Sequence, residues 1–175
     1  GYLMAALASY GVRALSAAFF FVLSHALSKG LAFLCAGHMA TKVGSRDLRA
    51  LRGVRTGMPI TTALFFLSLL SLAGLPGTCG FVAKFILISA LFSTASWWLG
   101  ILALLNAILM AAAYIRAIWS ILGPPEKGML KADGEGRLSL TAMILMALLI
   151  IILGFWPSPA LRLAYLGARD LLGVR

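Results

Sequence analysis

Residues 74–84 have the sequence GLPGTCGFVAK and lie between two apolar runs, residues 58–73 and 85–92. Glycine and proline here interrupt what would otherwise be one long membrane helix, and the freed backbone groups must face protein or water rather than lipid. Lys84 ends the stretch, and a lysine deep in a membrane segment is costly, so it indicates an ion or proton pathway. The residues expected to break the helix are Gly74, Pro76, Gly77 and Gly80.

The composition of the 175-residue chain is that of a membrane protein. Hydrophobic residues make up 62%, charged residues 11%, and the mean hydropathy is +1.01, whereas soluble domains contain about 45–50% apolar residues. The net charge of +10 does not indicate nucleic-acid binding, because the basic residues lie mainly between apolar runs and form no separate basic domain. We expect an all-α polytopic membrane protein, a transmembrane helix bundle with one discontinuous helix.

The apolar runs predict a single transmembrane domain over residues 1–175, since about 20 residues cross the hydrocarbon core. The chain opens inside an apolar run, so we expect a fragment or one half of a split subunit. The C-terminal tail mixes leucines with charged residues and is expected to lie at the membrane surface. The expected segments are a partial span at 1–10, full spans at about 14–40, 97–122 and 138–156, the segment 58–96 broken at 74–80, and the surface tail 160–175.

Residues 58–96 could cross the membrane once, as a broken helix, or twice, as a hairpin of two short helices. Loop charge distinguishes these possibilities, because basic residues accumulate in cytoplasmic loops. With one crossing, the basic loops 42–55 and 116–137 share a side that holds nine basic residues against four; with two crossings, the division is eight against five. The broken single helix is favoured, with both basic loops cytoplasmic and the C-terminus outside, in a prokaryotic cell membrane.

His25 and Lys29 lie near the middle of their span, four residues apart and therefore on one face of a helix. Histidine titrates near neutrality and a buried lysine changes its protonation readily, so the pair suits a proton relay. The alternative is a structural polar patch between helices. Together with Lys84, these two residues form the expected proton or ion pathway. Possible further members are His38, Ser28 and Thr78, although a histidine near a span end is equally consistent with an interfacial position.

The apolar spans contain no carboxylate, so the membrane lysines lack an acidic partner within them. An uncompensated buried charge is costly, so counter-charges must come from sequence outside this chain or from another subunit, or the lysines must be partly neutral. The two cysteines, Cys35 and Cys79, have no metal-ligand spacing, and no cofactor motif is present. We therefore expect no catalytic residue, metal or cofactor here. The five carboxylates are Asp47, Glu126, Asp133, Glu135 and Asp170.

Several ordered motifs in the chain resemble the antiporter-like membrane subunits. They are SHALSKGLAFL at 24–34, RDLR at 46–49 with LRG at 51–53, Met58-Pro59, and SLAGLPGTCGFVAKF at 71–85. That family includes subunits of proton-translocating NADH:quinone oxidoreductase, Mrp-type cation:proton antiporters and membrane-bound hydrogenases. The resemblance implies the C-terminal portion of such a subunit, with most of its second inverted repeat. It casts His25 and Lys29 as part of a central hydrophilic axis and Lys84 as the lysine of the exit-side half-channel.

The resemblance also implies a function. It is proton or cation translocation as a subunit of a redox-driven complex such as NADH:quinone oxidoreductase or a membrane-bound hydrogenase, with no redox chemistry in this chain. The alternative is a subunit of a secondary sodium/proton antiporter of Mrp type without a redox partner; a structural membrane scaffold is a third possibility. The expected partners are other membrane subunits, at least one supplying buried acidic residues, the lipid bilayer, and protons or sodium, but no nucleic acid.

Overall fold

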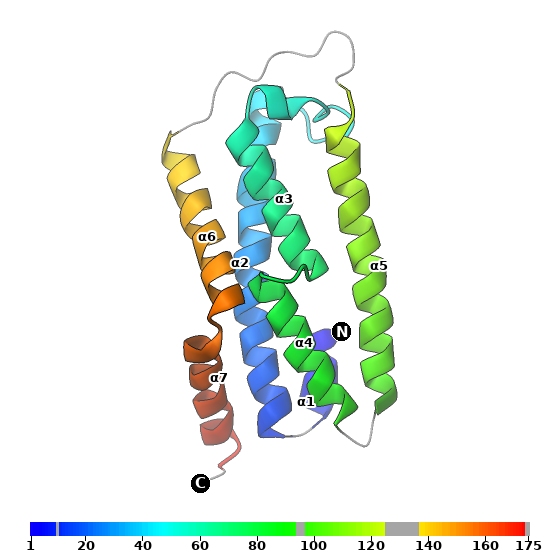
Figure 1. Ribbon diagram of the computed structural model, residues 1–175, viewed down its shortest axis with the longest axis vertical. Helices are drawn as coiled ribbons and strands as arrows, with labels where there is room; N and C mark the ends of the chain where they lie inside the picture. The colour runs from blue at the N-terminus through cyan, green and yellow to red at the C-terminus, as the bar shows by residue number, and fades with distance from the viewer. Residues whose placement is uncertain (10, 94–96, 125–136, 174–175) are drawn as a thin grey trace.

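The computed structural model describes residues 1–9, 11–93, 97–124 and 137–173. Every element in these ranges is helical, which confirms the all-α prediction. The longest helix, α2, follows a short helix α1 and occupies the centre of the bundle (Figure 1). The elements are α1 Tyr2–Ala8, α2 Val12–Val43, the 3-10 turn η1 Val54–Thr56, α3 Pro59–Ala73, α4 Cys79–Phe92, α5 Trp97–Leu122, α6 Arg137–Phe155 and α7 Ser158–Leu171.

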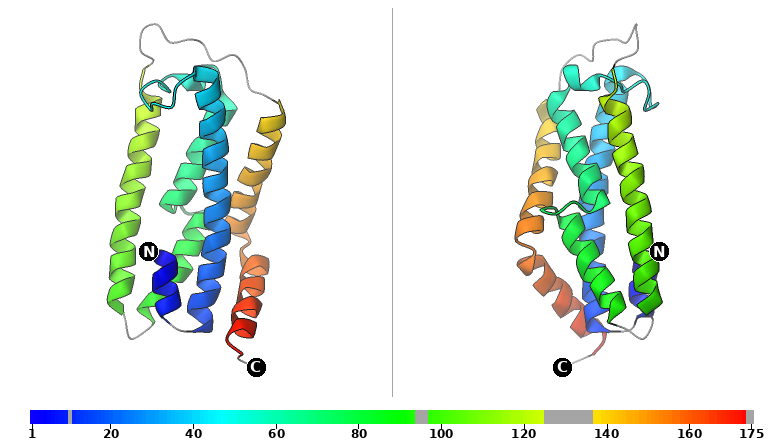
Figure 2. Two further views of the ribbon diagram at one scale, coloured as in Figure 1. Left: turned by 180° about the vertical axis from the view of Figure 1, so that it is seen from behind. Right: turned by 45° about the vertical axis from the view of Figure 1, so that its right-hand side comes forward.

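Helices α3 and α4 are the two halves of one broken helix. Both run in the same direction, α3 in the upper half of the molecule and α4 below it, rather than turning back on each other (Figure 1, Figure 2). The discontinuous helix is therefore confirmed and the hairpin alternative is wrong. The non-helical residues between the halves are 74–78, and Gly80 lies in the first turn of α4.

Main-chain hydrogen bonds close the C-terminus of α3. Gly74 adopts a left-handed backbone with φ +96°, which favours glycine. Its N–H donates to the Ser71 carbonyl at 3.0 Å, and the Leu75 N–H donates to the Leu70 carbonyl at 2.9 Å. These two bonds form a Schellman motif, which ends a helix and satisfies two of its last four carbonyls. The carbonyls of Leu72 and Ala73 are left for other donors.

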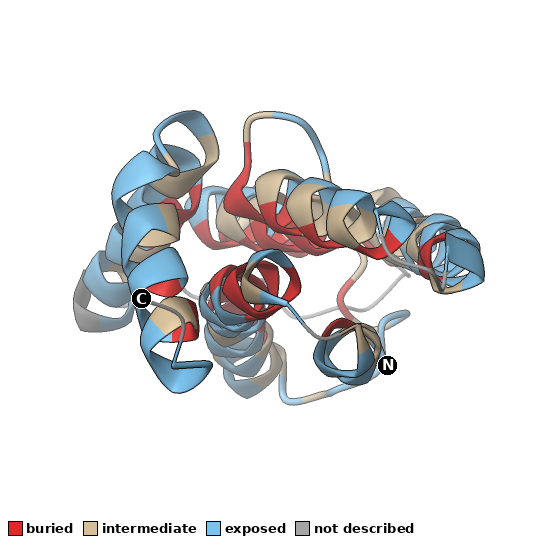
Figure 3. Cartoon of the chain, turned by 90° about the horizontal axis from the view of Figure 1, so that it is seen from below, coloured by how far each residue is buried: buried red, intermediate tan, exposed pale blue. Residues whose placement is uncertain are grey.

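The bundle has two hydrophobic cores, one on each side of the break. The upper core joins α3 and α6 to the C-terminal half of α2, with Leu31 and Met39 completely buried. The lower core joins α1, α4, α5 and α7 to the N-terminal half of α2 and includes Phe20 and Leu87. Burial is concentrated on the faces that point inward between the helices (Figure 3). The broken segment therefore lies where the two cores meet.

A second interruption separates α6 from α7. The two helices are bent by 79° at a break of at most four residues. The end of α6 packs on the first break so closely that a side chain at Gly154 would overlap the Gly77 carbonyl. Below the bend, α7 packs against α2 with Ala164 and Ala168 buried. The position of the tail at a membrane surface stays a prediction.

Two helices, α2 and α5, are long and apolar enough to cross a membrane, and the bent pair α6 and α7 makes a third if counted as one span. The outward faces of α5 and α6 expose large apolar side chains such as Leu109 and Leu145. That exposure suits helices that face lipid or other membrane subunits.

The basic segment that follows α2 lies at the same end of the bundle as the C-terminus of α5 (Figure 1). The Gly53 N–H donates to the Ile121 carbonyl at 3.4 Å, which joins the two regions directly. This proximity agrees with one crossing by α3 and α4. Lys127 and Lys131 of the second basic loop lie outside the described residues.

Candidate functional site

The ammonium group of Lys84 binds the C-terminus of α3. Its Nζ donates to the Leu72 carbonyl at 2.6 Å and to the Ala73 carbonyl at 3.1 Å. These are the two terminal carbonyls that the Schellman motif does not satisfy, so all four of the last carbonyls of α3 have donors. The C-terminus of a helix carries partial negative charge, which stabilises a cation placed there. A residue of α4 thus holds the end of α3.

His25 and Lys84 line the same small pocket between α2, α3 and α4. Ser24, Ser28 and Ser71 line it too, and none of its lining residues is acidic. Both potential proton carriers therefore face one polar space at the break. His25 is also within electrostatic reach of both Lys84 and Lys29.

A buried hydroxyl and thiol cluster fixes the break against α2. The Ser28 and Ser71 Oγ atoms are 2.8 Å apart and share a hydrogen bond, and the Ser24 hydroxyl donates to the Cys79 Sγ at 3.3 Å. Because Ser71 belongs to α3 and Cys79 to α4, both halves of the broken helix are tied to the same face of α2. Gly80 packs directly on the Ser71 carbonyl, where any side chain would overlap it.

A second cavity of about 280 Å³ extends from this pocket toward α5. His25 and Lys84 line it together with Tyr2, Asn106 and Tyr114. Since a water molecule occupies about 30 Å³ in the liquid, the cavity has room for several. The Tyr2 hydroxyl donates to the Ala103 carbonyl at 2.9 Å, which joins α1 to α5 at the cavity wall. The two carriers therefore border a space large enough for a chain of waters.

Sequence reasoning missed the contribution of α5 and α1 to this cavity. Asn106 is the one amide side chain in the apolar sequence of α5, and a lone polar residue in a membrane helix is a signal that could have been used. Tyr2 and Tyr114 carry no such signal, because tyrosines occur widely in membrane helices.

The structure separates the other predicted residues from the pocket. Lys29 is exposed on the outer face of α2, with its Nζ 5.8 Å from the centre of the Phe33 ring. His38 lies thirteen residues beyond His25 on the same helix, or about 20 Å along its axis. The Thr78 hydroxyl donates to the Leu75 carbonyl at 2.7 Å, within the turn of the break. Of the predicted residues, His25, Ser28 and Lys84 come together.

Within the described ranges, no group of three or more histidine, cysteine or acidic residues could hold a metal ion. The arrangement instead offers two groups that can carry protons, a cavity that can hold water, and main-chain carbonyls that bind a cation. Such a set can bind and pass on a proton or a small cation.

Comparison with known proteins assigns the family. Residues 1–110, which contain α1 to α4 and both sides of the break, match the transmembrane family model of NADH:quinone oxidoreductase/Mrp antiporter proteins. The chain belongs to this family. It is an integral membrane protein, as the apolar spans also indicate. The resemblance of its motifs to the antiporter-like subunits is thereby confirmed.

Relatives of this antiporter-family chain include both redox and antiporter proteins. It is 29% identical to F(420)H(2) dehydrogenase subunit N of Methanosarcina mazei, over 98% of the chain and 37% of the relative. It is 33% identical to a Na(+)/H(+) antiporter protein of Alkalihalophilus pseudofirmus, over 91% of the chain and 32% of the relative. The chain therefore spans about a third of the length of the curated relatives it matches.

The fold is shared with a solved structure of an Mrp complex from Dietzia. The superposition has a TM-score of 0.87 with 24% sequence identity, and it covers 97% of this chain and 40% of the other. At that identity the likeness shows the fold of an antiporter-like membrane subunit.

Proposed function

We propose that this chain forms part of an antiporter-like subunit that moves protons across an energy-coupling membrane, with Lys84 as the terminal proton-loading site. One observation carries the proposal: the Lys84 ammonium binds the free carbonyls of α3 and faces the same cavity as His25. The carbonyls stabilise the charged form of a lysine that has no acidic neighbour among the residues lining its pockets.

In this proposal His25 and Lys84 exchange a proton through water in the cavity between them. Lys29, four residues further along α2, delivers protons to His25 from the outer face of the helix, and His38 and Ser28 extend the pathway along α2. Thr78 shapes the turn. Acidic residues of other membrane subunits change the electrostatic field at the lysines and so load and release the proton. The basic loops face the cytoplasm of a prokaryotic cell.

We place this subunit in a redox-driven complex, in keeping with its likeness to F(420)H(2) dehydrogenase subunit N. The second candidate is a secondary sodium/proton antiporter without a redox partner. It is favoured by the likeness to the Na(+)/H(+) antiporter protein and by the fold shared with the Mrp complex.

Proton movement by the intact membrane assembly containing the full-length protein tests both candidates. The assembly is reconstituted into proteoliposomes with a pH-sensitive dye inside. Proton flux that requires electron transfer, with iron–sulfur or flavin subunits in the purified assembly, supports the redox-driven complex. Proton flux driven by an imposed sodium gradient alone supports the antiporter. Absence of both fluxes from a fully assembled sample contradicts the proposed function.

Asn106→Leu should slow proton movement without preventing assembly, because it removes the polar group of α5 from the cavity that Lys84 lines. Loss of one hydrogen bond of about 0.5–1.5 kcal/mol corresponds to a reduction in rate of about two- to tenfold. The rate is measured in the same proteoliposomes. Leu109→Ala, on the exposed surface of the same helix, is the matched control and should transport normally. Equal rates for both variants would exclude a role for the α5 side of the cavity.

A further inference from the structure

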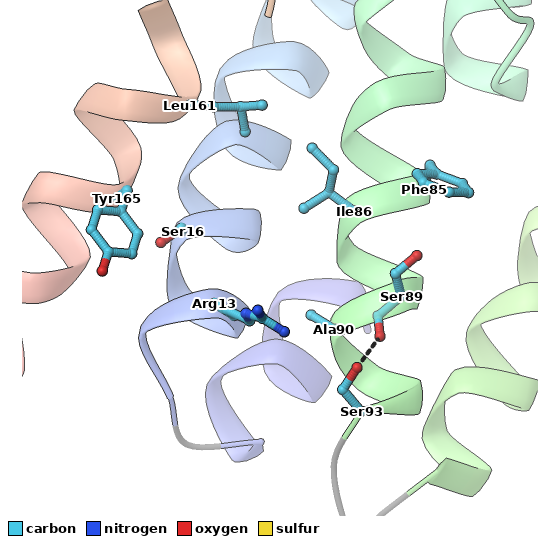
Figure 4. Close-up of a pocket in the computed structure, with 9 residues that line it drawn as sticks. All are labelled: Arg13, Ser16, Phe85, Ile86, Ser89, Ala90, Ser93, Leu161 and Tyr165. Atoms are coloured by element: carbon cyan, nitrogen blue, oxygen red, sulfur yellow. Dashed lines mark hydrogen bonds between the residues drawn. The ribbon is translucent and has the colours of Figure 1, made fainter. Parts of the chain in front are cut away.

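A separate cavity lies in the lower half of the molecule, between α2, α4 and α7. Its volume is about 380 Å³, and it does not include His25 or Lys84. Arg13 projects into the space between α2 and α4 (Figure 4). Serine and tyrosine hydroxyls line it from the other two helices, and no acidic residue does. The polar lining residues used below are Arg13, Ser89, Ser93 and Tyr165.

The cavity has a polar end and an apolar end. Arg13 and Ser93 lie at the end where α2 begins and α4 finishes, while Phe85 and Leu161 lie at the opposite end, toward the middle of the bundle (Figure 4). Helix termini mark the membrane–water interface, and the middle of the bundle corresponds to the hydrocarbon region. A phospholipid has the same gradient, with a phosphate at the interface and acyl chains directed inward.

The polar end has unused donors for an anion. Among the described residues, the guanidinium group of Arg13 has no hydrogen bond or ion pair, and the hydroxyls of Ser89 and Tyr165 have no hydrogen bond. The Ser93 hydroxyl is occupied, because it donates to the Ser89 carbonyl at 3.0 Å (Figure 4). A guanidinium group with several N–H donors binds a phosphate in two-pronged fashion, and its charge is not balanced by any lining residue.

We propose that this cavity binds one anionic phospholipid, with its phosphate on Arg13 and an acyl chain along Phe85 and Leu161. The net negative charge of the headgroup offsets the unpaired guanidinium charge, which a zwitterionic headgroup does only partly. The hydroxyls of Ser89 and Tyr165 supply further hydrogen bonds to the phosphate oxygens. The lipid fills the space between α4 and α7 and so supports the lower core.

The test uses the full-length protein in its intact membrane assembly, stripped of lipid by detergent. Phosphatidylglycerol, phosphatidylcholine and inorganic phosphate are added separately, and both bound lipid and thermal stability are measured. Phosphatidylglycerol should bind and raise Tm, whereas phosphatidylcholine should bind at least tenfold more weakly and phosphate should have no effect. Arg13→Gln should weaken phosphatidylglycerol binding about tenfold or more, the loss expected for one charge-assisted hydrogen bond.

Two variants keep the result interpretable. Arg162→Gln removes an exposed arginine of α7 that does not line the cavity, and it should bind phosphatidylglycerol like the wild type. Ser89→Leu fills the cavity while keeping Arg13, and it should also lose the lipid even if Arg13→Gln does not assemble. The proposal is overturned if inorganic phosphate stabilises the assembly equally, if both lipids bind equally, or if the assembled cavity variants retain wild-type binding.

Discussion

Lys84→Met should abolish proton transport and also weaken the structure around the helix break. Methionine has nearly the length of lysine but carries no proton and donates no hydrogen bond. The carbonyls of Leu72 and Ala73 would lose their side-chain donor, and each buried polar group left unsatisfied costs about 1–3 kcal/mol. We expect no proton flux above background in proteoliposomes and a lower Tm for the purified assembly.

Lys84→Arg is the matched control, because it separates the two effects. Arginine can donate to the same carbonyls but stays protonated, so it can support the break without releasing a proton. We expect a Tm closer to that of the wild type than the methionine variant gives, with transport still lost. Wild-type flux from the arginine variant would contradict proton release at this position. Equal Tm values for methionine and wild type would show that the bonds to α3 contribute nothing to stability.

Gly80→Ala should destabilise the protein more than any other single methyl addition at the break. The new Cβ would overlap the carbonyl oxygen of Ser71, which is backbone and cannot rotate away. Overpacking of this kind costs about 1–3 kcal/mol or more, and here it pushes apart the two halves that the serine and cysteine contacts hold together. The expected result is a strongly reduced Tm or yield of the full-length protein, measured by thermal unfolding after purification in detergent.

Gly37→Ala is the control for that substitution. Gly37 is also helical, in α2, and a Cβ there meets no atom within 4 Å. Since alanine is favoured over glycine in a helix by up to about 1 kcal/mol, this variant should be as stable as the wild type or slightly more so. The close packing inferred at Gly80 would be refuted if the two alanine variants unfolded at the same temperature.

Local sequence was sufficient to predict the broken helix and the importance of Lys84. Glycine and proline between two apolar runs have few other meanings in a membrane segment, and loop charge chose correctly between one crossing and two. The cavity was harder, because Asn106 reaches it from α5 and Tyr2 from α1. Which helices become neighbours depends on tertiary packing, and no spacing within one segment reveals it.

Helical spacing was also too coarse a guide for His25 and Lys29. Residues four apart share a face, yet they differ by about 40° around the axis. That difference is enough for His25 to line the pocket while Lys29 is exposed. The search for an acidic partner similarly considered side chains alone. The carbonyls at the end of α3 supply partial negative charge to Lys84 without any carboxylate, and only the direction of the lysine side chain reveals this.

The two interruptions also decide how the bundle can transmit force. Because Gly154 packs on Gly77, the bend between α6 and α7 and the break between α3 and α4 occupy one level of the molecule. Among the described helices, only α2 and α5 run unbroken past that level (Figure 1). The molecule therefore has the construction of a joint, with two rods carrying the load and a lysine latch at the pivot. Torque applied to the lower half would be concentrated at the bonds between Lys84 and α3.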